Sequence, residues 1–252
     1  MHKNRANRKE ALLENIIYGR NSVLELLKAG KRTANKLMVS ETARGTTISE
    51  IISLAKQKGI AVHTVPPEKF NKYSQQSQGV AVEVSSIEYI EIEDLINQSM
   101  QSSSKPLLVI LDGIEDPHNL GAIIRNCVAF GADGIIIPKW RAVGVNETVS
   151  KASAGAVEHI LISKVSNLNQ AIDLLKENNF WIVGAENGGQ RLESSELPFP
   201  SAIVIGSEGF GLHNLTKKHC DFLISIPQKN VISSLNASCA SAVILYEVSK
   251  KR

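Results

Sequence analysis

The sequence predicts an α/β protein with a large C-terminal domain on a parallel sheet and a smaller N-terminal α/β domain. From Lys105 onward, apolar strand-like runs alternate with helix-like segments, and a stretch rich in Gln and Ser precedes this pattern. With 252 residues, 43% of them hydrophobic, the chain can form two globular domains. We expect a basic tail over 1–15, a first domain over 16–86, a linker over 87–104 and a second domain over 105–252.

The first domain is expected to begin with a helix over 21–30 that ends at Gly30, a residue type that commonly terminates helices. The strand KLMVS follows, and a second helix over 48–59 places its isoleucines on one face. Two further strands are expected over 60–65 and 80–84. These elements together predict a small α/β domain.

The segment PPEKFNKYSQQSQG (66–79) combines aromatic and basic residues. Rings beside cations suit stacking on unpaired bases with phosphate contacts nearby, so Lys69, Lys72 and Tyr73 are candidate RNA contacts. The alternative is a surface loop whose Phe70 and Tyr73 rings fold back onto the domain. The sequence supports this alternative at least as well.

Basic residues are concentrated in the N-terminal third. Residues 1–86 carry 14 Lys and Arg against 7 Asp and Glu, a net charge of +7. Residues 87–104 have a net charge of −4, and 105–252 carry 14 residues of each sign. The asymmetry indicates that the first domain attracts a polyanion, with a solubilising surface as an equal alternative.

In the second domain, nearly continuous Val, Ile and Leu strands alternate with helices, which indicates a parallel sheet covered on both faces. Ligands in such sheets bind at the carboxyl ends of the strands, where Asp112, Asn119, 206–211 and 227–236 fall. The dinucleotide fingerprint G-x-G-x-x-G is missing after the first strand, and no G-x-x-x-x-G-K-[S/T] occurs. These absences disfavour an enzyme that binds dinucleotides or nucleoside triphosphates.

Metal, disulfide and membrane functions find no support. Cys127, Cys220 and Cys239 lack the Cys-x-x-Cys and Cys-His spacings of zinc sites. No apolar stretch approaches the roughly 18 residues that span a bilayer, and the basic N-terminus lacks the apolar core of a signal peptide. We therefore expect a cytoplasmic protein without a metal site or a membrane partner.

The segment DPHNLGAIIRN (116–126) is expected to form a helix with Asn119 at its N-cap. Arg125 lies on the polar face, one turn from Gly121 and from Ala129, so a large ligand can approach its guanidinium. The planar guanidinium suits a phosphate. From this segment alone, however, a solvated arginine is favoured by about two to one.

The second informative segment is VIGSEGFGL (204–212), in which a buried strand runs into three glycines. Gly206, Gly209 and Gly211 allow the backbone to pass close to a ligand, and Glu208 lies within this turn. Taken alone, the glycines favour a tight structural turn.

The third segment, SLNASCASAVILYE (234–247), opens a helix with polar residues and continues with Ala, Cys and aliphatic residues almost all round. Capping alone can explain Ser234, and it can explain Asn236 as well. Polar side chains and free N–H groups at this end can hold a phosphate or a ribose hydroxyl. A helix this apolar is expected to be buried, partly against another subunit.

In order and spacing, these three segments resemble the motifs of the SpoU/TrmH family of SPOUT-class RNA 2'-O-ribose methyltransferases. The stretch IYGRNSVLELLKAG is similar to the substrate-binding domain of that family, so the resemblance runs from about residue 16 over nearly the whole chain. It is closest to the large-subunit rRNA guanosine 2'-O-methyltransferases. One departure is Ser77-Gln78-Gly79, where the family usually has His-Gln-Gly.

The resemblance implies a deep C-terminal trefoil knot, S-adenosyl-L-methionine as cofactor, an RNA substrate and a homodimer whose active sites use both subunits. The catalytic residues that it implies are Asn119, Arg125, Glu208, Ser234 and Asn236. The implied cofactor-binding residues are Gly206, Ser207, Gly209, Gly211, Ile226, Pro227, Leu235 and Asn236. Together with the loop analysis, it suggests RNA contacts by Arg20, Lys69, Lys72 and Tyr73.

We therefore expect S-adenosylmethionine-dependent methylation of a ribose 2'-hydroxyl in structured RNA, with a guanosine of 23S rRNA as acceptor. In such an in-line transfer the enzyme supplies alignment and proton removal, and Arg125 grips a phosphate because its guanidinium stays protonated. A tRNA 2'-O-methyltransferase and a catalytically inactive RNA-binding or ribosome-assembly factor are alternatives. An unrelated nucleotide-binding α/β enzyme is a third, which the missing fingerprints disfavour.

Overall fold

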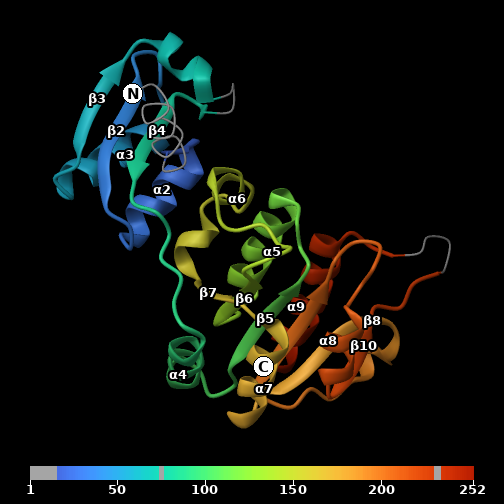
Figure 1. Cartoon of the computed structure of the whole chain (residues 1–252). Coiled ribbons are helices and arrows are strands. Elements are labelled where there is room, and N and C mark those ends of the chain that lie inside the picture. Colours follow the sequence, from blue (N-terminus) through green and yellow to red (C-terminus); the bar gives the residue numbers. More distant parts are fainter. Residues whose placement is uncertain (1–15, 74–76, 230–233) are drawn as a thin grey trace, which may run out of the picture. The chain divides into compact units, whose positions relative to one another are not determined.

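The structure is a computed structural model, and the residues that it describes are 16–73, 77–229 and 234–252. Backbone contacts divide the chain into two compact units (Figure 1). The N-terminal unit comprises residues up to Ile87 together with 145–159, and the remaining residues form the C-terminal unit. The predicted basic tail, 1–15, lies outside the described residues.

The N-terminal unit contains a four-stranded sheet in the order β1-β4-β2-β3. Its strands are β1 (Ile16–Tyr18), β2 (Ala34–Ser40), β3 (Ala61–Val65) and β4 (Val80–Val84). Strand β4 pairs antiparallel with β1 and β2, whereas β2 and β3 are parallel. Helices α2 (Arg20–Ala29) and α3 (Thr46–Gln57) bury their apolar faces in the core of this unit. Gly30 ends α2 in the left-handed conformation, as predicted.

The segment predicted to contact RNA forms the 3-10 helix η1 (Pro67–Tyr73). Phe70 is buried and packs with Ile16 and Ala81, so its ring folds back onto the unit, as the alternative interpretation held. Lys69 is exposed. The side chains of Lys72 and Tyr73 lie outside the described residues.

Residues 145–159, which lie between two strands of the C-terminal sheet in the sequence, belong to the N-terminal unit. They form α6 (Glu147–Ala152) and the 3-10 helix η3 (Ala156–His159). The guanidinium of Arg32 is 3.1 Å from the carboxylate of Glu158, and both side chains are buried. The sequence-based division had assigned this segment to the second domain, because nothing in its pattern shows which core it joins.

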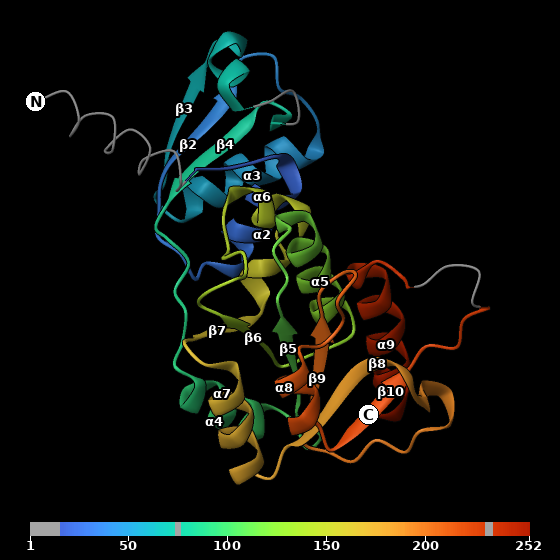
Figure 2. The same ribbon diagram turned by 45° about the vertical axis from the view of Figure 1, so that its right-hand side comes forward.

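The C-terminal unit contains a six-stranded, wholly parallel sheet in the order β10-β8-β9-β5-β6-β7. Its strands are β5 (Leu107–Asp112), β6 (Gly134–Pro138), β7 (Leu161–Val165), β8 (Trp181–Arg191), β9 (Ser201–Gly206) and β10 (Phe222–Ser225). Figure 2 shows β5 and β9 side by side with their carboxyl ends at the same edge. Every residue of β5 is buried, as expected for a strand covered on both faces.

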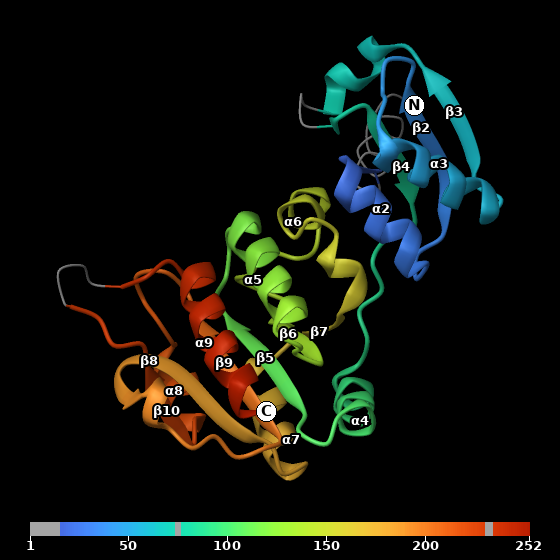
Figure 3. The same cartoon turned by 180° about the vertical axis from the view of Figure 1, so that it is seen from behind.

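Helices cover both faces of this sheet. Its helices are α4 (Ile92–Ser102), α5 (Pro117–Ala129), α7 (Leu168–Glu177), α8 (Asn214–His219) and α9 (Ala237–Lys251), with the 3-10 helix η4 (Leu192–Ser194). Helices α4 and α7 share one hydrophobic cluster with the sheet. Figure 3 shows α5 and α9 together over the other face. No helix in the described part of the chain is long and apolar enough to cross a membrane.

The predicted linker, 87–104, contains helix α4 and is therefore not an irregular connection. Leu95, Ile96 and Ser99 of this helix are buried, and the two apolar side chains join the core of the C-terminal unit. The sequence shows little sign of this helix because Gln and Ser surround a narrow apolar stripe.

Candidate active site

The site lies where β9 ends in a closed glycine turn. The Ser207 N–H donates to the Gly211 carbonyl at 3.1 Å, and the Gly211 N–H donates to the Ser207 carbonyl at 3.0 Å. A Cβ atom on Gly206 would overlap the Gly211 carbonyl group, so only glycine allows this close approach of two backbone segments. Glu208 is therefore presented at the carboxyl edge of the sheet by a rigid turn.

The first motif differs from its prediction at the helix start. Asp116, not Asn119, caps α5, and its carboxylate accepts from the His118 N–H at 3.0 Å. Pro117 occupies the first turn, where its missing N–H is no loss, so the helix begins earlier than we expected. Because Asn119 does not serve as the cap, its amide is available for the site.

The third motif supplies the cap of α9. The Asn236 side-chain oxygen accepts from the Ser238 N–H at 2.9 Å and from the Cys239 N–H at 3.3 Å, which confirms a capping role. The amide nitrogen of Asn236 donates to Asn119 Oδ1 at 3.0 Å and also to Glu208 Oε1. Asn119 Nδ2 donates to the same Glu208 oxygen at 2.7 Å. One residue from each motif therefore takes part in a single hydrogen-bonded triangle.

A pocket of about 330 Å³ lies on one side of Glu208, and we call it the first pocket. Its apolar wall includes Ile205, Ile224, Ile226, Leu235, Ala237, Ala240 and Ile244. Of the predicted cofactor-binding residues, Gly206, Ser207, Gly209, Gly211, Ile226 and Leu235 line this pocket. Pro227 and Asn236 do not, although both adjoin lining residues. Ser234, a predicted catalytic residue, also lines it.

The polar wall of the first pocket contains two residues that the sequence analysis missed, Glu186 and Asn187. Glu186 and Asn187, near the middle of β8, line it together with Gln228. Glu186 is 3.2 Å from the Lys217 ammonium. The side-chain oxygen of Gln228 is buried and has no hydrogen-bond partner in the described part of the chain. An apolar slot with an unsatisfied buried amide suits a ligand that combines a flat ring with polar groups.

The other side of Glu208 faces a second pocket of about 370 Å³. It is lined by Gly113, Ile114, Glu115, Asp116, Asn119, Arg141, Ser207, Glu208, Phe210 and His213. Ser207, Glu208 and Phe210 line both pockets, so the glycine turn is their common wall. Reactive groups of two ligands can therefore meet at Glu208.

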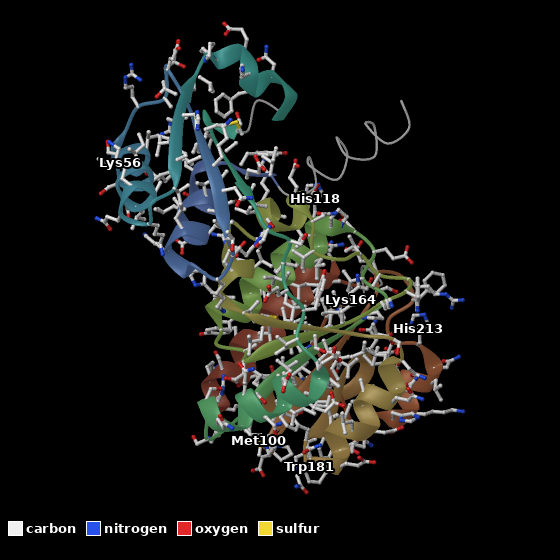
Figure 4. All side chains as sticks on the ribbon, turned by 60° about the vertical axis from the view of Figure 1, so that its left-hand side comes forward. Lys56, Met100, His118, Lys164, Trp181 and His213 are labelled. Atoms are coloured by element: carbon white, nitrogen blue, oxygen red, sulfur yellow. The ribbon has the colours of Figure 1, made fainter. Side chains whose placement is uncertain are left out.

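His213 in the wall of the second pocket is held by Asp112, which ends β5. The buried Asp112 carboxylate accepts from the His213 backbone N–H at 2.9 Å and lies 2.8 Å from its Nδ1 atom. The imidazole side chain is 56% exposed, and Figure 4 labels it at the surface. The sequence placed Asp112 at a strand end but offered no sign of its partner.

Two predicted groups lie away from these pockets. Arg125 is exposed on α5, lines neither pocket and has no hydrogen-bond or ion-pair partner in the described ranges. In the N-terminal unit, the Arg20 N–H donates to Gln78 Oε1 at 3.0 Å, and Arg20 Nε donates to the Gln78 carbonyl at 3.3 Å. With Thr42, Ala43 and Gly79, these two residues line a shallow hollow. The departure at Ser77-Gln78-Gly79 thus lies beside Arg20, and Ser77 itself is buried.

Comparison with known families decides what kind of protein presents this site. The model described as SpoU rRNA Methylase family matches residues 106–246. The model described as RNA 2'-O ribose methyltransferase substrate binding matches residues 16–90. The chain belongs to the SpoU methylase family. The members of this family are RNA 2'-O-ribose methyltransferases that use S-adenosylmethionine as methyl donor.

Relatives of this SpoU-family chain match it over most of its length. It is 42% identical over 238 residues to a putative TrmH family tRNA/rRNA methyltransferase, YacO, of Bacillus subtilis, covering 94% of this chain and 95% of that protein. A putative TrmH family tRNA/rRNA methyltransferase of Staphylococcus saprophyticus is 43% identical over 242 residues, covering 95% and 96%.

Solved structures share the fold at lower identity. The SpoU methyltransferase AviRb of Streptomyces viridochromogenes, in complex with AdoMet, matches with a TM-score of 0.79 and 21% identity, covering 97% of this chain and 93% of that one. An AdoMet-bound rRNA methyltransferase of Sinorhizobium meliloti matches with a TM-score of 0.78 and 22% identity, covering 98% and 90%. These likenesses support the α/β architecture of the SpoU-family chain.

Proposed function

We propose that this SpoU-family chain methylates the 2'-hydroxyl of a guanosine in large-subunit rRNA, with S-adenosylmethionine in the first pocket and the acceptor nucleotide in the second. The observation that carries the proposal is the common wall of the two pockets, where Glu208 is held by Asn119 and Asn236. A transfer between two ligands requires such a meeting point. Neither a single-ligand binding protein nor an assembly factor does.

The first pocket has the chemistry that this cofactor needs. Its aliphatic residues can enclose an adenine ring, and Glu186, Asn187 and Gln228 offer partners for hydroxyl and amino groups. Bound there, S-adenosylmethionine supplies a methyl group on a sulfonium, which carries positive charge. The Glu208 carboxylate attracts that charge toward the junction of the pockets.

The hydrogen-bonded triangle provides the alignment. Asn119 and Asn236 both donate to one oxygen of Glu208, so the carboxylate cannot rotate freely, and its other oxygen remains available to the ligands. Alignment of two reactants can contribute roughly 7–11 kcal/mol to lowering a barrier. The triangle is therefore a device for orientation.

The position of Arg125 supports the proposal that the protein acts as a homodimer. It is the predicted phosphate-gripping residue, yet it lines neither pocket of its own chain. A second copy that brings its own Arg125 to the site would account for this position, because the two subunits of a two-fold dimer contribute the same residues to each other. On the family's pattern we also propose a trefoil knot in the C-terminal unit and action in the cytoplasm on RNA.

The most specific part of the proposal is the choice of large-subunit rRNA as the acceptor RNA. The first domain matches the substrate-binding model of the family, and the net charge of +7 over residues 1–86 suits a large folded RNA. The relatives' names include both tRNA and rRNA, so tRNA is the second candidate.

The test is to map 2'-O-methylated nucleotides by mass spectrometry in rRNA and tRNA from cells with and without the gene. We expect one guanosine of the large-subunit rRNA to lose its methyl group when the gene is deleted and to regain it on complementation. Loss from a tRNA selects the second candidate, and unchanged maps together with no activity in vitro refute methyl transfer. Calorimetry with S-adenosylhomocysteine separates an enzyme from an inactive factor, which is not expected to bind it.

A further inference from the structure

Phe210 is an exposed aromatic residue in the closed glycine turn that follows β9. It is 90% exposed, although it lies between Gly209 and Gly211, whose φ angles of 84° and 66° fix the turn. The two backbone hydrogen bonds between Ser207 and Gly211 close this turn. Phe210 also lines the second pocket, so its exposed ring is available to a planar ligand that enters that pocket. Because Phe210 and Glu208 both line the second pocket, a base that stacks on Phe210 inside this pocket shares it with Glu208.

The second pocket also contains one uncommitted carboxylate. Three carboxylates line it, and two already accept hydrogen bonds: Asp116 from the His118 N–H, and Glu208 from Asn119 and Asn236. Glu115, which directly precedes Asp116, is exposed and has no hydrogen-bond or ion-pair partner in the described part of the chain. Both of its oxygens can therefore accept hydrogen bonds from a ligand.

We propose that Phe210 and Glu115 together select guanine as the acceptor base, Phe210 by stacking on its face and Glu115 by accepting from its edge. This inference rests on the proposed methyl transfer and specifies its acceptor. Guanine presents two adjacent donors, the ring N1–H and the 2-amino group, which match the two oxygens of one carboxylate.

The other bases do not fit this pair of groups. Adenine and cytosine present an acceptor nitrogen beside their amino group, so a carboxylate oxygen would face a lone pair. Uracil has a single N–H between two carbonyl groups. Stacking alone tolerates every base, because each has a π face, and therefore the discrimination comes from Glu115.

The first experiment asks which nucleoside the wild-type protein methylates. Full-length protein is incubated with S-adenosylmethionine carrying a deuterated methyl group and with total RNA from cells that lack the gene, and the RNA is digested to nucleosides for mass spectrometry. We expect the label in 2'-O-methylguanosine alone. Label in another 2'-O-methyl nucleoside overturns the guanine assignment but leaves methyl transfer intact. No labelled 2'-O-methyl nucleoside at all means that the proposed function itself fails.

The second experiment tests the two side chains at saturating S-adenosylmethionine, with a synthetic RNA that spans the labelled position. Phe210→Ala is expected to lower kcat/KM about 10- to 100-fold, the range that loss of a stacked base gives, while Phe210→Trp stays within about threefold of wild type. Leu215→Ala, which removes another exposed apolar side chain without touching either pocket, is the matched control. An unchanged kcat/KM for Phe210→Ala overturns the stacking role.

The edge contact is tested by replacing the acceptor guanosine with inosine, which keeps the N1–H but lacks the 2-amino group. The kcat/KM of wild type is expected to be about tenfold lower on the inosine substrate, which is the scale of one lost hydrogen bond to a charged group. The Glu115→Gln variant is expected to have the same kcat/KM on both substrates. Glu93→Gln, an exposed carboxylate outside both pockets, should discriminate like wild type. Equal discrimination between guanosine and inosine by Glu115→Gln and by wild type overturns the role of Glu115. Light scattering of Phe210→Ala provides a further check. If this variant is monomeric where wild type is a dimer, the Phe210 ring lies in a subunit contact, and the stacking role is overturned.

Discussion

Asn119 and Glu208, which are 89 residues apart in the chain, are joined by a hydrogen bond of 2.7 Å. Asn119 lies in the first turn of α5, and Glu208 lies in the turn after β9. The bond is possible because β5 and β9 are parallel neighbours, so the segments after their carboxyl ends meet at one edge of the sheet. This contact connects the first two motifs, and Asn236 adds the third.

Glu208→Gln is expected to lower the single-turnover rate of methyl transfer by about 100-fold, as removal of one oriented polar group often does in active sites. The amide keeps the shape of the side chain but lacks the negative charge and one acceptor. Affinity for S-adenosylhomocysteine, measured by calorimetry, should change by no more than a few-fold. Glu196→Gln, on an exposed carboxylate away from the pockets, is the control. A Glu208→Gln variant as fast as this control would remove Glu208 from the mechanism.

Arg125→Ala is expected to abolish methyl transfer while cofactor affinity stays within a few-fold. If Arg125 acts in the partner's site, co-expression of Arg125→Ala with Glu208→Gln restores about a quarter of wild-type activity, because half of the randomly mixed dimers then contain one intact site. If Arg125 acts in its own chain, the mixed dimers stay inactive. Differently tagged subunits allow the mixed dimers to be purified and assayed separately.

Gly206→Ala and Gly209→Ala should differ sharply. A Cβ on Gly206 would overlap the Gly211 carbonyl, so the turn must open, and we expect loss of S-adenosylhomocysteine binding. A Cβ on Gly209 meets nothing within 4 Å, and its φ of 84° costs about 1–2 kcal/mol. Urea unfolding and calorimetry of both variants provide the measurements. Equal binding by the two variants would show that closure of the turn is not required.

The three cysteines should react with iodoacetamide in order of exposure. Cys239 is exposed and is expected to react first. Burial raises the pKa of the Cys220 thiol to about 11, with the Asp221 carboxylate adding to the effect, so its alkylation should accelerate with each pH unit up to that value. Burial also raises the pKa of Cys127 far above the usual range, and this thiol should react only after unfolding. Mass spectrometry of peptides from a pH series tests the order.

The same shifts predict the sign of a pH effect on stability. Between pH 9, where the thiols of the unfolded chain ionise, and about 11, the folded chain holds its Cys220 proton more tightly than the unfolded chain does. The free energy of unfolding should therefore fall as the pH rises through this window. Cys220→Ala should make that fall less steep, and an identical slope in the variant would contradict the burial argument.

Removing one partner of the buried Arg32–Glu158 pair should strongly lower the free energy of unfolding of the N-terminal unit. Its side chains are only 7% and 3% exposed, and Glu158→Gln leaves a buried guanidinium without its counter-charge, which typically costs about 3–5 kcal/mol. The exposed Lys28–Glu50 pair is the comparison, and Glu50→Gln should cost less than about 1 kcal/mol. Urea denaturation of both variants measures the difference. The double variant Arg32→Met with Glu158→Leu should recover most of the loss.

Regular elements could be predicted where periodicity was strong. The Val, Ile and Leu strands of the parallel sheet and the capped helix ending at Gly30 have local signals that the structure confirms. Helix α4 was missed because its buried face consists of few apolar side chains among Gln and Ser. The N-cap of α5 differs from the prediction because Asp116-Pro117 is a stronger start signal than Asn119.

The candidate site could be predicted in its members but not in its arrangement. Asn119, Glu208 and Asn236 each occur in a recognisable segment, yet their meeting depends on strand order, which no local pattern shows. Glu186 was missed because it is a single polar residue inside β8, and one polar residue within a strand is no sign of a ligand site. The partnership of Asp112 with His213 joins residues 101 positions apart and has no local sign.

Residues 145–159 leave the C-terminal sheet and return to it, so the polypeptide crosses between the two units three times. A single protease cut after residue 87 therefore cannot release the N-terminal unit. A gene fragment encoding 105–252 would still include Val149 and Val157, but not the rest of the N-terminal unit that buries them. The protein fragment should therefore aggregate and express poorly. In evolution, recombination at a single point in the gene cannot exchange the whole N-terminal unit, because residues 145–159 must be exchanged with it.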